Sequence, residues 1–121
     1  SPLSDAQIEG REHLQVLWEE IKRLPPAQRK AICFSTEDTS GEDLLSVLLG
    51  KGIVTAPELA AEFDLTIEDF SELLARLPLA DNKELADTLG VSGKQASQWR
   101  FRAHRTLRKR LAGIKNKLFA Q

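Results

Sequence analysis

The stretch DNKELADTLGVSGKQASQW, residues 81–99, decides the fold, because its pattern predicts two helices that cross at a tight turn. Leu85 is followed by the small residue Ala86, which lets a second helix cross the first closely. Gly90 accepts a left-handed backbone without a steric penalty, as the end of a first helix requires. These features predict a helix-turn-helix over residues 82–111.

A long helix is predicted after this turn, with Ser92 as its N-cap and Leu118 as its furthest residue. Its apolar residues recur at helical spacing and form one stripe: Ala96, Trp99, Ala103, Leu107, Leu111, Ile114 and Leu118. The opposite side carries Lys94, Gln98, Phe101 and Arg105, with Ser97, Arg108 and Lys109 at its edges. We expect the apolar stripe to pack on the first helix and the basic side to face outward.

The formal net charge of −1 conceals a strong asymmetry along the chain. All 18 acidic residues lie at or before Asp87, whereas nine of the 17 basic residues lie from Lys94 onward. The first 93 residues therefore carry a formal charge of −10 and the remainder carry +9. Such a division is typical of a polyanion-binding end joined to an acidic body.

The basic helix is predicted to bind double-stranded DNA, because a helix without acidic residues repels itself unless an anion faces it. The first turns of such a helix enter the major groove, where Gln98 suits adenine, Lys94 suits guanine and Phe101 suits a thymine methyl group. The more distal arginines and lysines suit phosphates. The candidate DNA-binding residues are Ser92, Lys94, Gln95, Ser97, Gln98, Phe101, Arg102, Arg105, Arg108 and Lys109.

The rest of the chain also has the pattern of helices and shows no strand-like alternation, so the expected fold class is all-α. The expected architecture is a helical bundle that ends in a helix-turn-helix with a long basic C-terminal helix. Residues 1–80 are predicted to form an acidic helical body, and residues 81–121 the DNA-binding segment. We expect the two parts to form one compact unit. The absence of methionine, even at position 1, predicts that this unit was excised from a longer chain. The expected upstream helices span residues 5–24, 27–34, 42–49, 57–63 and 67–77, and residues 83–89 form the first helix of the helix-turn-helix.

A faint internal repeat links residues 56–73 to residues 82–99 at an offset of 26. It predicts a degenerate helix-turn-helix over residues 56–77. The second helix of this upstream copy has acids, Glu68, Asp69 and Glu72, where the downstream copy has Lys94, Gln95 and Gln98. Phosphate would repel such a helix, so it suits scaffolding or a protein partner better than DNA. Duplication and convergence on a common helical hairpin are equally compatible with the alignment.

Two segments resemble region four of bacterial sigma factors. Residues 24–31, Leu-Pro-Pro-Ala-Gln-Arg-Lys-Ala, are similar to its leucine-proline opening, and Glu84-Leu85-Ala86 through Leu89-Gly90-Val91-Ser92, then Gln98, Ala103, Leu107 and Leu111, resemble its helix-turn-helix. The resemblance implies binding to the minus-35 promoter element and contact with RNA polymerase or another regulator protein. Residues 35–80 form an insertion relative to the family, and Gly93, Ser97 and Arg100 depart from its pattern. The base preference therefore does not carry over.

An enzyme is not expected, and neither is a cofactor. His13 and His104 have no metal-ligand or catalytic-triad neighbours at a telling spacing, and Cys33 is more typical of a buried small hydrophobe. The sequence has no transmembrane stretch or signal-peptide pattern, and one cysteine suits a reducing, cytoplasmic setting. The main alternative function is a protein-interaction module whose basic C-terminal helix docks on an acidic protein partner.

Overall fold

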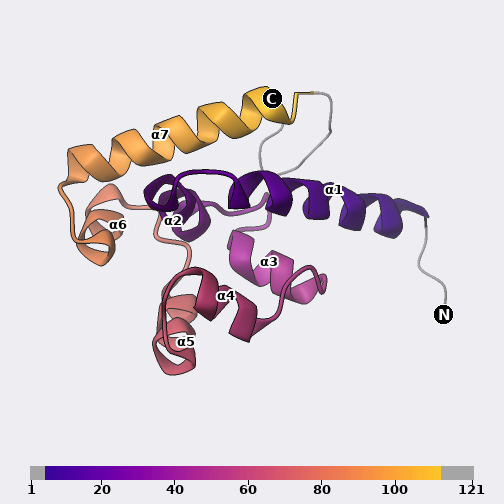
Figure 1. Ribbon diagram of the computed structural model, residues 1–121, viewed down its shortest axis with the longest axis horizontal. Coiled ribbons are helices and arrows are strands. Elements are labelled where there is room, and N and C mark those ends of the chain that lie inside the picture. Colours follow the sequence, from indigo (N-terminus) through magenta and orange to yellow (C-terminus); the bar gives the residue numbers. More distant parts are fainter. Residues whose placement is uncertain (1–4, 113–121) are drawn as a thin grey trace.

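The computed structural model describes residues 5–112, with side chains from residue 10 onward. This part of the chain is helical, without named strands, which confirms the predicted all-α class. Its helices are α1 (Asp5–Lys22), α2 (Pro26–Ser35), α3 (Leu44–Gly50), α4 (Ala56–Glu62), α5 (Ile67–Arg76), α6 (Asn82–Leu89) and α7 (Gly93–Arg110). Figure 1 shows α7 lying across α2 at one side of the molecule, with the α4–α5 hairpin at the other side.

Side-chain caps and prolines set most of the helix ends, as the sequence predicts. Three hydroxyl side chains act as N-caps, those of Thr55, Thr66 and Ser92. Each accepts one hydrogen bond from the backbone N–H of the residue three positions later, and these caps begin α4, α5 and α7. Three bounds differ from expectation by two residues or more. The first helix ends at Lys22 rather than residue 24, and α3 begins at Leu44 because Asp43, and not an earlier residue, is its N-cap. The long basic helix, α7, ends at Arg110 with Leu111 as its C-cap and does not extend to Leu118.

Helix α2 is the centre of the packing, with α7, α6 and α3 against it. Its second half is buried, and Ala31 in this half is fully enclosed. Ala103, on α7, is also fully buried, and small side chains of this kind let two helices approach closely. Helix α7 therefore belongs to the same hydrophobic core as residues from the acidic half of the chain, including Leu17 and Leu59.

The two hairpins of the sequence repeat have matching turns. Asp64 and Gly90, which the 26-residue offset aligns, both adopt a left-handed backbone, with φ of 58° and 71°. In each hairpin the following residue then donates its N–H back to an alanine carbonyl of the first helix, from Leu65 at 2.8 Å and from Val91 at 3.0 Å. The α4–α5 hairpin therefore has the local geometry of the α6–α7 helix-turn-helix.

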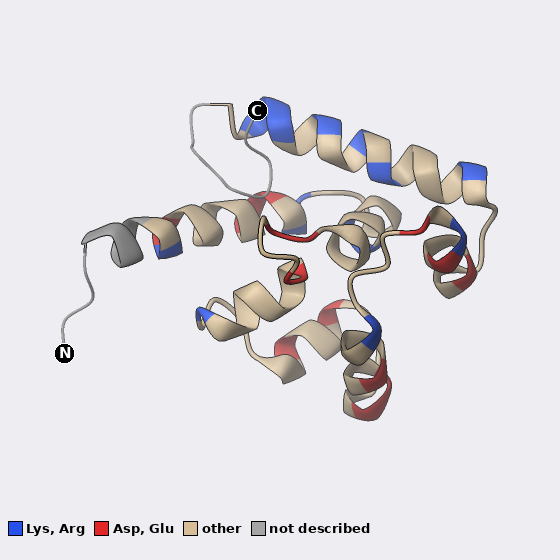
Figure 2. Cartoon of the chain, turned by 180° about the vertical axis from the view of Figure 1, so that it is seen from behind, with Lys and Arg blue, Asp and Glu red and all other residues tan. Residues whose placement is uncertain are grey.

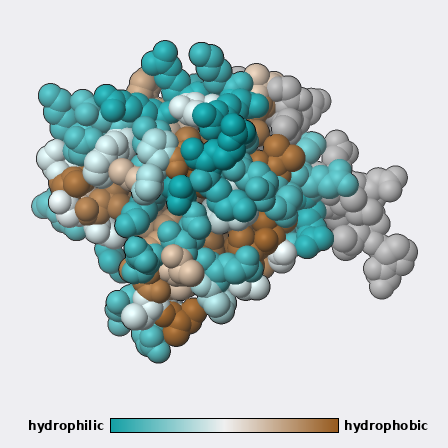
Figure 3. Space-filling model, viewed as in Figure 1, coloured by the Kyte–Doolittle hydropathy of each residue, from teal (hydrophilic) through white to brown (hydrophobic). Residues whose placement is uncertain are grey.

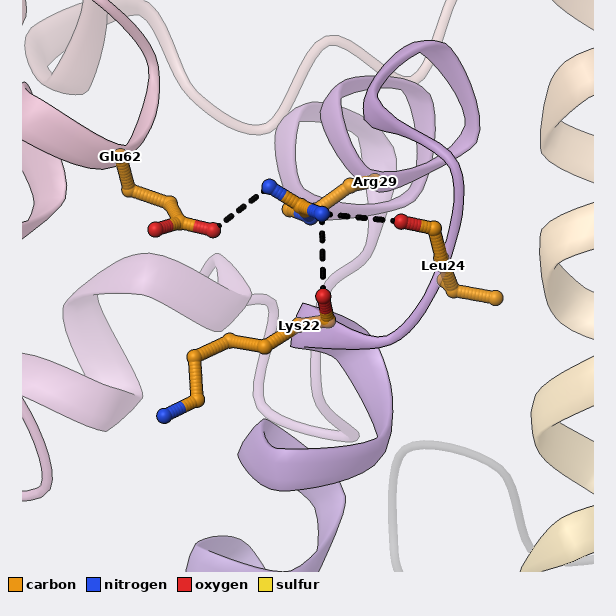
Figure 4. A network of polar contacts seen from close by, with 4 residues as sticks. All are labelled: Lys22, Leu24, Arg29 and Glu62. Atoms are coloured by element: carbon orange, nitrogen blue, oxygen red, sulfur yellow. Dashed lines mark hydrogen bonds and ion pairs between the residues drawn. The ribbon is translucent and has the colours of Figure 1, made fainter.

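Arg29 joins three elements of the acidic half (Figure 4). Its Nη1 donates to Glu62 Oε1 at 2.7 Å, and this ion pair links α2 to α4. Its Nη2 donates to the carbonyl oxygens of Lys22 and Leu24, both at 2.9 Å, where α1 ends. The side chains of Arg29 and Glu62 are only 18% and 26% exposed, so solvent screens their attraction less than at an open surface.

Replacing Arg29 by methionine is expected to lower the free energy of unfolding by about 1.5–3 kcal/mol, because Glu62 and two carbonyls lose a charged donor together. Urea unfolding followed by circular dichroism measures this change. Arg23→Met is the matched control, since its pair with Glu20 lies within one helix turn and the Arg23 side chain is 69% exposed. The control should change stability by less than about 0.5 kcal/mol, and an equal loss in both variants would contradict a special role for Arg29.

Candidate nucleic-acid interface

Helix α7 has one face buried in the protein. Ala96, Ala103 and Leu107 are fully buried, and Leu111 just beyond the helix is 4% exposed. Trp99 is half-buried on the same side. This face packs on α2, α6 and α1, so the predicted apolar stripe is correct as far as Leu111. Its two remaining predicted members, Ile114 and Leu118, lie outside the described residues.

The opposite face of α7 is open to solvent. Along it, Lys94, Gln98 and Arg105 are exposed, and Phe101 presents 65% of its surface. The flanking residues Ser97, Arg102, Arg108 and Lys109 are exposed as well. Figure 2 shows blue segments along α7 and no red, whereas red segments lie on α5 and α6. Figure 3 shows hydrophilic residues at the same edge of the molecule. The structure thus brings the predicted side chains together on one surface, called here the basic face.

The first turn of α7 is held firmly in place. Gly90 ends α6 in the left-handed conformation, and the hydroxyl of Ser92 accepts the N–H of Gln95 at 3.1 Å. Ser92 itself is exposed, and its hydroxyl proton remains a donor toward the solvent side. Gln95 is half-buried, unlike the other predicted contacts. This geometry leaves the amino-terminal end of α7 accessible from outside.

Arg100 has a structural role that sequence reasoning missed. Its Nη1 donates to the carbonyl oxygen of Ala80 and to Asn82 Oδ1, both at 3.1 Å. These bonds tie the middle of α7 to Ala80, which precedes α6, and to Asn82, the first residue of α6. The only signal for this role in the sequence is that Arg100 follows Trp99, at the edge of the apolar stripe. From that position a long side chain can reach the backbone of a neighbouring segment.

A hollow of about 460 Å³ lies on the distal half of the basic face. Its lining comes from α7 itself: Phe101, His104, Arg105, Arg108 and Lys109. Burial lowers the pKa of His104 below its usual value of about 6.5, and the charges of Arg108 and Arg100 lower it further. The imidazole is therefore neutral at pH 7, and the positive charge of this hollow comes from its arginines and lysine.

The corresponding helix of the upstream hairpin has the opposite charge. Glu68, Asp69 and Glu72 on α5 are all exposed. They lie on the same local scaffold as the basic face, with reversed electrostatics. A polyanion would therefore meet one attractive and one repulsive hairpin on this chain.

Three further observations concern metal, cysteine and membrane chemistry in the described part of the chain. No three His, Cys, Asp or Glu residues within it are grouped so that they could hold a metal ion. Cys33 is buried, and burial raises the pKa of its thiol, which disfavours the reactive thiolate. None of the described helices is long and apolar enough to cross a membrane.

Comparisons with protein-family models, curated proteins and solved structures found no match to this chain. The functional assignment of α7 therefore depends on the geometry and charge of its own residues.

Proposed function

We propose that this chain binds double-stranded DNA sequence-specifically, with α7 as the recognition helix. The observation that carries the proposal is the two-sided character of α7. One side is locked into the core by Ala96, Ala103 and Leu107, and the other presents cations, amides and one aromatic ring to solvent without a single acid. A rigid helix held in this way needs no ordering when it enters a groove, so little binding energy is lost to entropy.

The basic face divides into two parts with different roles. Lys94, Gln98 and Phe101 project from the first turns of α7, the part of a recognition helix that reaches base edges. Gln98 has the donor and acceptor pair that matches adenine, and Lys94 donates to guanine. Arg105 and Lys109 lie farther along the helix, where the groove curves away and phosphates are the nearer groups.

In biological terms, we infer a sigma region-four-like domain that reads a promoter element and contacts RNA polymerase or another regulator. The inference is supported by the resemblance of residues 24–31 and 84–111 to that region. The residues between them, 35–80, contain α3, α4 and α5. A regulator built from such a domain, with an acidic hairpin added, accounts for both the resemblance and the insertion.

A protein-interaction module is the second candidate, and the acidic surface of α5 is the observation that favours it. The basic face of one copy is complementary in charge to Glu68, Asp69 and Glu72 of another. This function predicts salt-sensitive self-association in the absence of DNA. Sedimentation velocity at low and high salt measures that association directly.

Fluorescence anisotropy with labelled promoter-like duplexes tests the DNA proposal. Affinity should fall steeply as salt rises from 50 to 200 mM, because bound phosphates release counterions. The double variant Lys94→Ala with Gln98→Ala should lower the ratio of affinities for the best and a scrambled duplex by about 30-fold or more, since each of the two lost base contacts discriminates by about 1–3 kcal/mol.

Lys83→Ala with Gln28→Ala is the matched control, because it removes the same two residue types outside the basic face. It should leave the preference unchanged. Salt-sensitive binding without any sequence preference would reduce the basic face to a polyanion patch. If the chain binds none of the duplexes, the proposal of DNA binding is wrong.

A further inference from the structure

A groove of about 320 Å³ lies between the two helical hairpins, away from the basic face. One wall is the α2 surface that carries Pro26, Ala27, Lys30 and Phe34, which recur at helical spacing. The second wall comes from the α4–α5 hairpin and the third from the α6–α7 hairpin. This volume falls within the range of about 300–1,000 Å³ that small organic ligands occupy in proteins.

The two hairpin walls are equivalent in the internal repeat. Phe63 and Leu73 line the groove from the upstream hairpin, and the residues 26 positions later, Leu89 and Trp99, line it from the downstream one. The groove therefore lies at the junction of two similar units. Ligand sites occur preferentially between packed helices and at the interfaces of structural units.

The walls are braced, so the groove exists before a ligand arrives. The rings of Phe34 and Phe63 meet edge to face, with centroids 5.0 Å apart, and join α2 to α4. Arg29 and Glu62, which form an ion pair between the same two segments, directly precede the lining residues Lys30 and Phe63 in the sequence. Across the groove, Arg76 Nη2 donates to Thr88 Oγ1 at 3.1 Å.

Two donors interrupt an otherwise apolar lining. Lys30 is half-buried, and it has no carboxylate partner among the residues that the structure describes. Its helical neighbours one turn away, Pro26, Ala27 and Phe34, carry no charge. Thr88 accepts from Arg76, which leaves its own hydroxyl proton for another acceptor. The Lys30 ammonium, without a carboxylate partner among the described residues, is therefore available to bind an anion.

We propose that this groove binds a small amphipathic anion, an aromatic or branched apolar molecule that carries one carboxylate or sulfonate. The apolar body lies between Phe34, Leu73 and Trp99, and the anionic group receives donors from Lys30 and Thr88. The proposal is independent of DNA binding, because none of the groove residues belongs to the basic face. Failure of either one leaves the other intact.

Two fluorescent probes test the proposal on the full chain: 8-anilinonaphthalene-1-sulfonate, and N-phenyl-1-naphthylamine, which has the same rings without the sulfonate. The sulfonate should bind saturably at one site per chain. In two-dimensional NMR spectra it should shift the indole N–H signal of Trp99, which lines the groove, more than that of Trp18, which does not.

Lys30→Met should weaken the sulfonate about tenfold and leave the neutral probe within twofold, because only the sulfonate interacts with the ammonium. Ala27→Phe, which fills the groove from α2, should abolish binding of both probes. Lys51→Met and Ala61→Phe are the matched controls, since both residues are exposed and lie outside the groove.

Three outcomes would overturn the proposal. One is the absence of saturable binding, and another is binding that survives Ala27→Phe. The third is an equal effect of Lys30→Met on both probes, which would show that the ammonium does not recognise the anionic group.

Discussion

Reversing two charges on the distal basic face, with Arg105→Glu and Lys109→Glu, should weaken binding to duplex DNA by about 100-fold at 0.1 M salt. Both side chains are exposed on α7, and their removal leaves the buried face of the helix untouched. Each phosphate contact contributes a factor of about 8 at this salt concentration, because the binding constant varies with salt to the power of about −0.9 per contact. Repulsion by the new glutamates adds to the loss of two contacts.

The salt dependence gives this experiment its resolving power. The slope of log affinity against log salt should become shallower by about two, one unit for each lost phosphate contact. Sequence preference should remain, because Lys94 and Gln98 are unchanged. A variant that lost preference and affinity together would place Arg105 and Lys109 among the base-reading residues and contradict the division of the basic face.

Lys51→Glu with Arg23→Glu is the control for long-range electrostatics. It changes the net charge by the same amount, and both residues are exposed outside α7, just after the ends of α1 and α3. DNA affinity should fall by less than about threefold in this control, since a Debye length of about 10 Å at 0.1 M salt screens distant charges. A loss as large as that of the α7 variant would mean that net charge alone drives the binding.

The local features of the helix-turn-helix were predictable from sequence because each depends on residues close in the chain. Gly90 adopts the left-handed backbone of the turn without a steric penalty whatever packs around it, and the hydroxyl of Ser92 accepts the N–H of the residue three positions later. Burial of Ala96 and Ala103 follows from helical periodicity in the same way. The exposed candidates on the opposite face were predictable as the complement of this stripe.

Contacts between distant segments were not predictable, because no local pattern encodes them. Arg29 and Glu62 are 33 residues apart, and their pairing depends on how α2 and α4 dock. Arg100 illustrates a different limit. The helical wheel gives the direction of its Cβ, but its long side chain then reaches back to Ala80 and Asn82.

The positive φ of Asp64 shows how a repeat can carry information that composition lacks. Asp is less favoured than Gly in this conformation, so the residue type by itself is a weak signal for a turn. The alignment of Asp64 with Gly90 in the internal repeat is a stronger signal for a turn. Neither the residue types nor the internal repeat predicts the groove between the hairpins, because its walls come from three segments that only the tertiary fold brings together.

Leu107→Ala should lower the free energy of unfolding by about 2–5 kcal/mol, a large fraction of the 5–15 kcal/mol typical of a domain. Leu107 is fully buried on α7, in the same core as Leu17 and Leu59 from the acidic half. Removing its side chain leaves a cavity between the two halves of the chain. Urea unfolding followed by circular dichroism measures the loss.

The same variant tests whether α7 is integral to the fold or an appendage on an acidic body. Trp18 on α1 and Trp99 on α7 report on the two halves separately, in variants that each retain one tryptophan. With one shared core, Leu107→Ala should shift both fluorescence transitions to the same lower urea midpoint. Val16→Ala, on a side chain that is 40% exposed, should move neither by more than about 0.5 kcal/mol. A lower urea midpoint at Trp99 with an unchanged midpoint at Trp18 would show instead that α7 unfolds separately from the acidic half. The basic face would then lie on a flexible segment rather than on a rigid recognition helix.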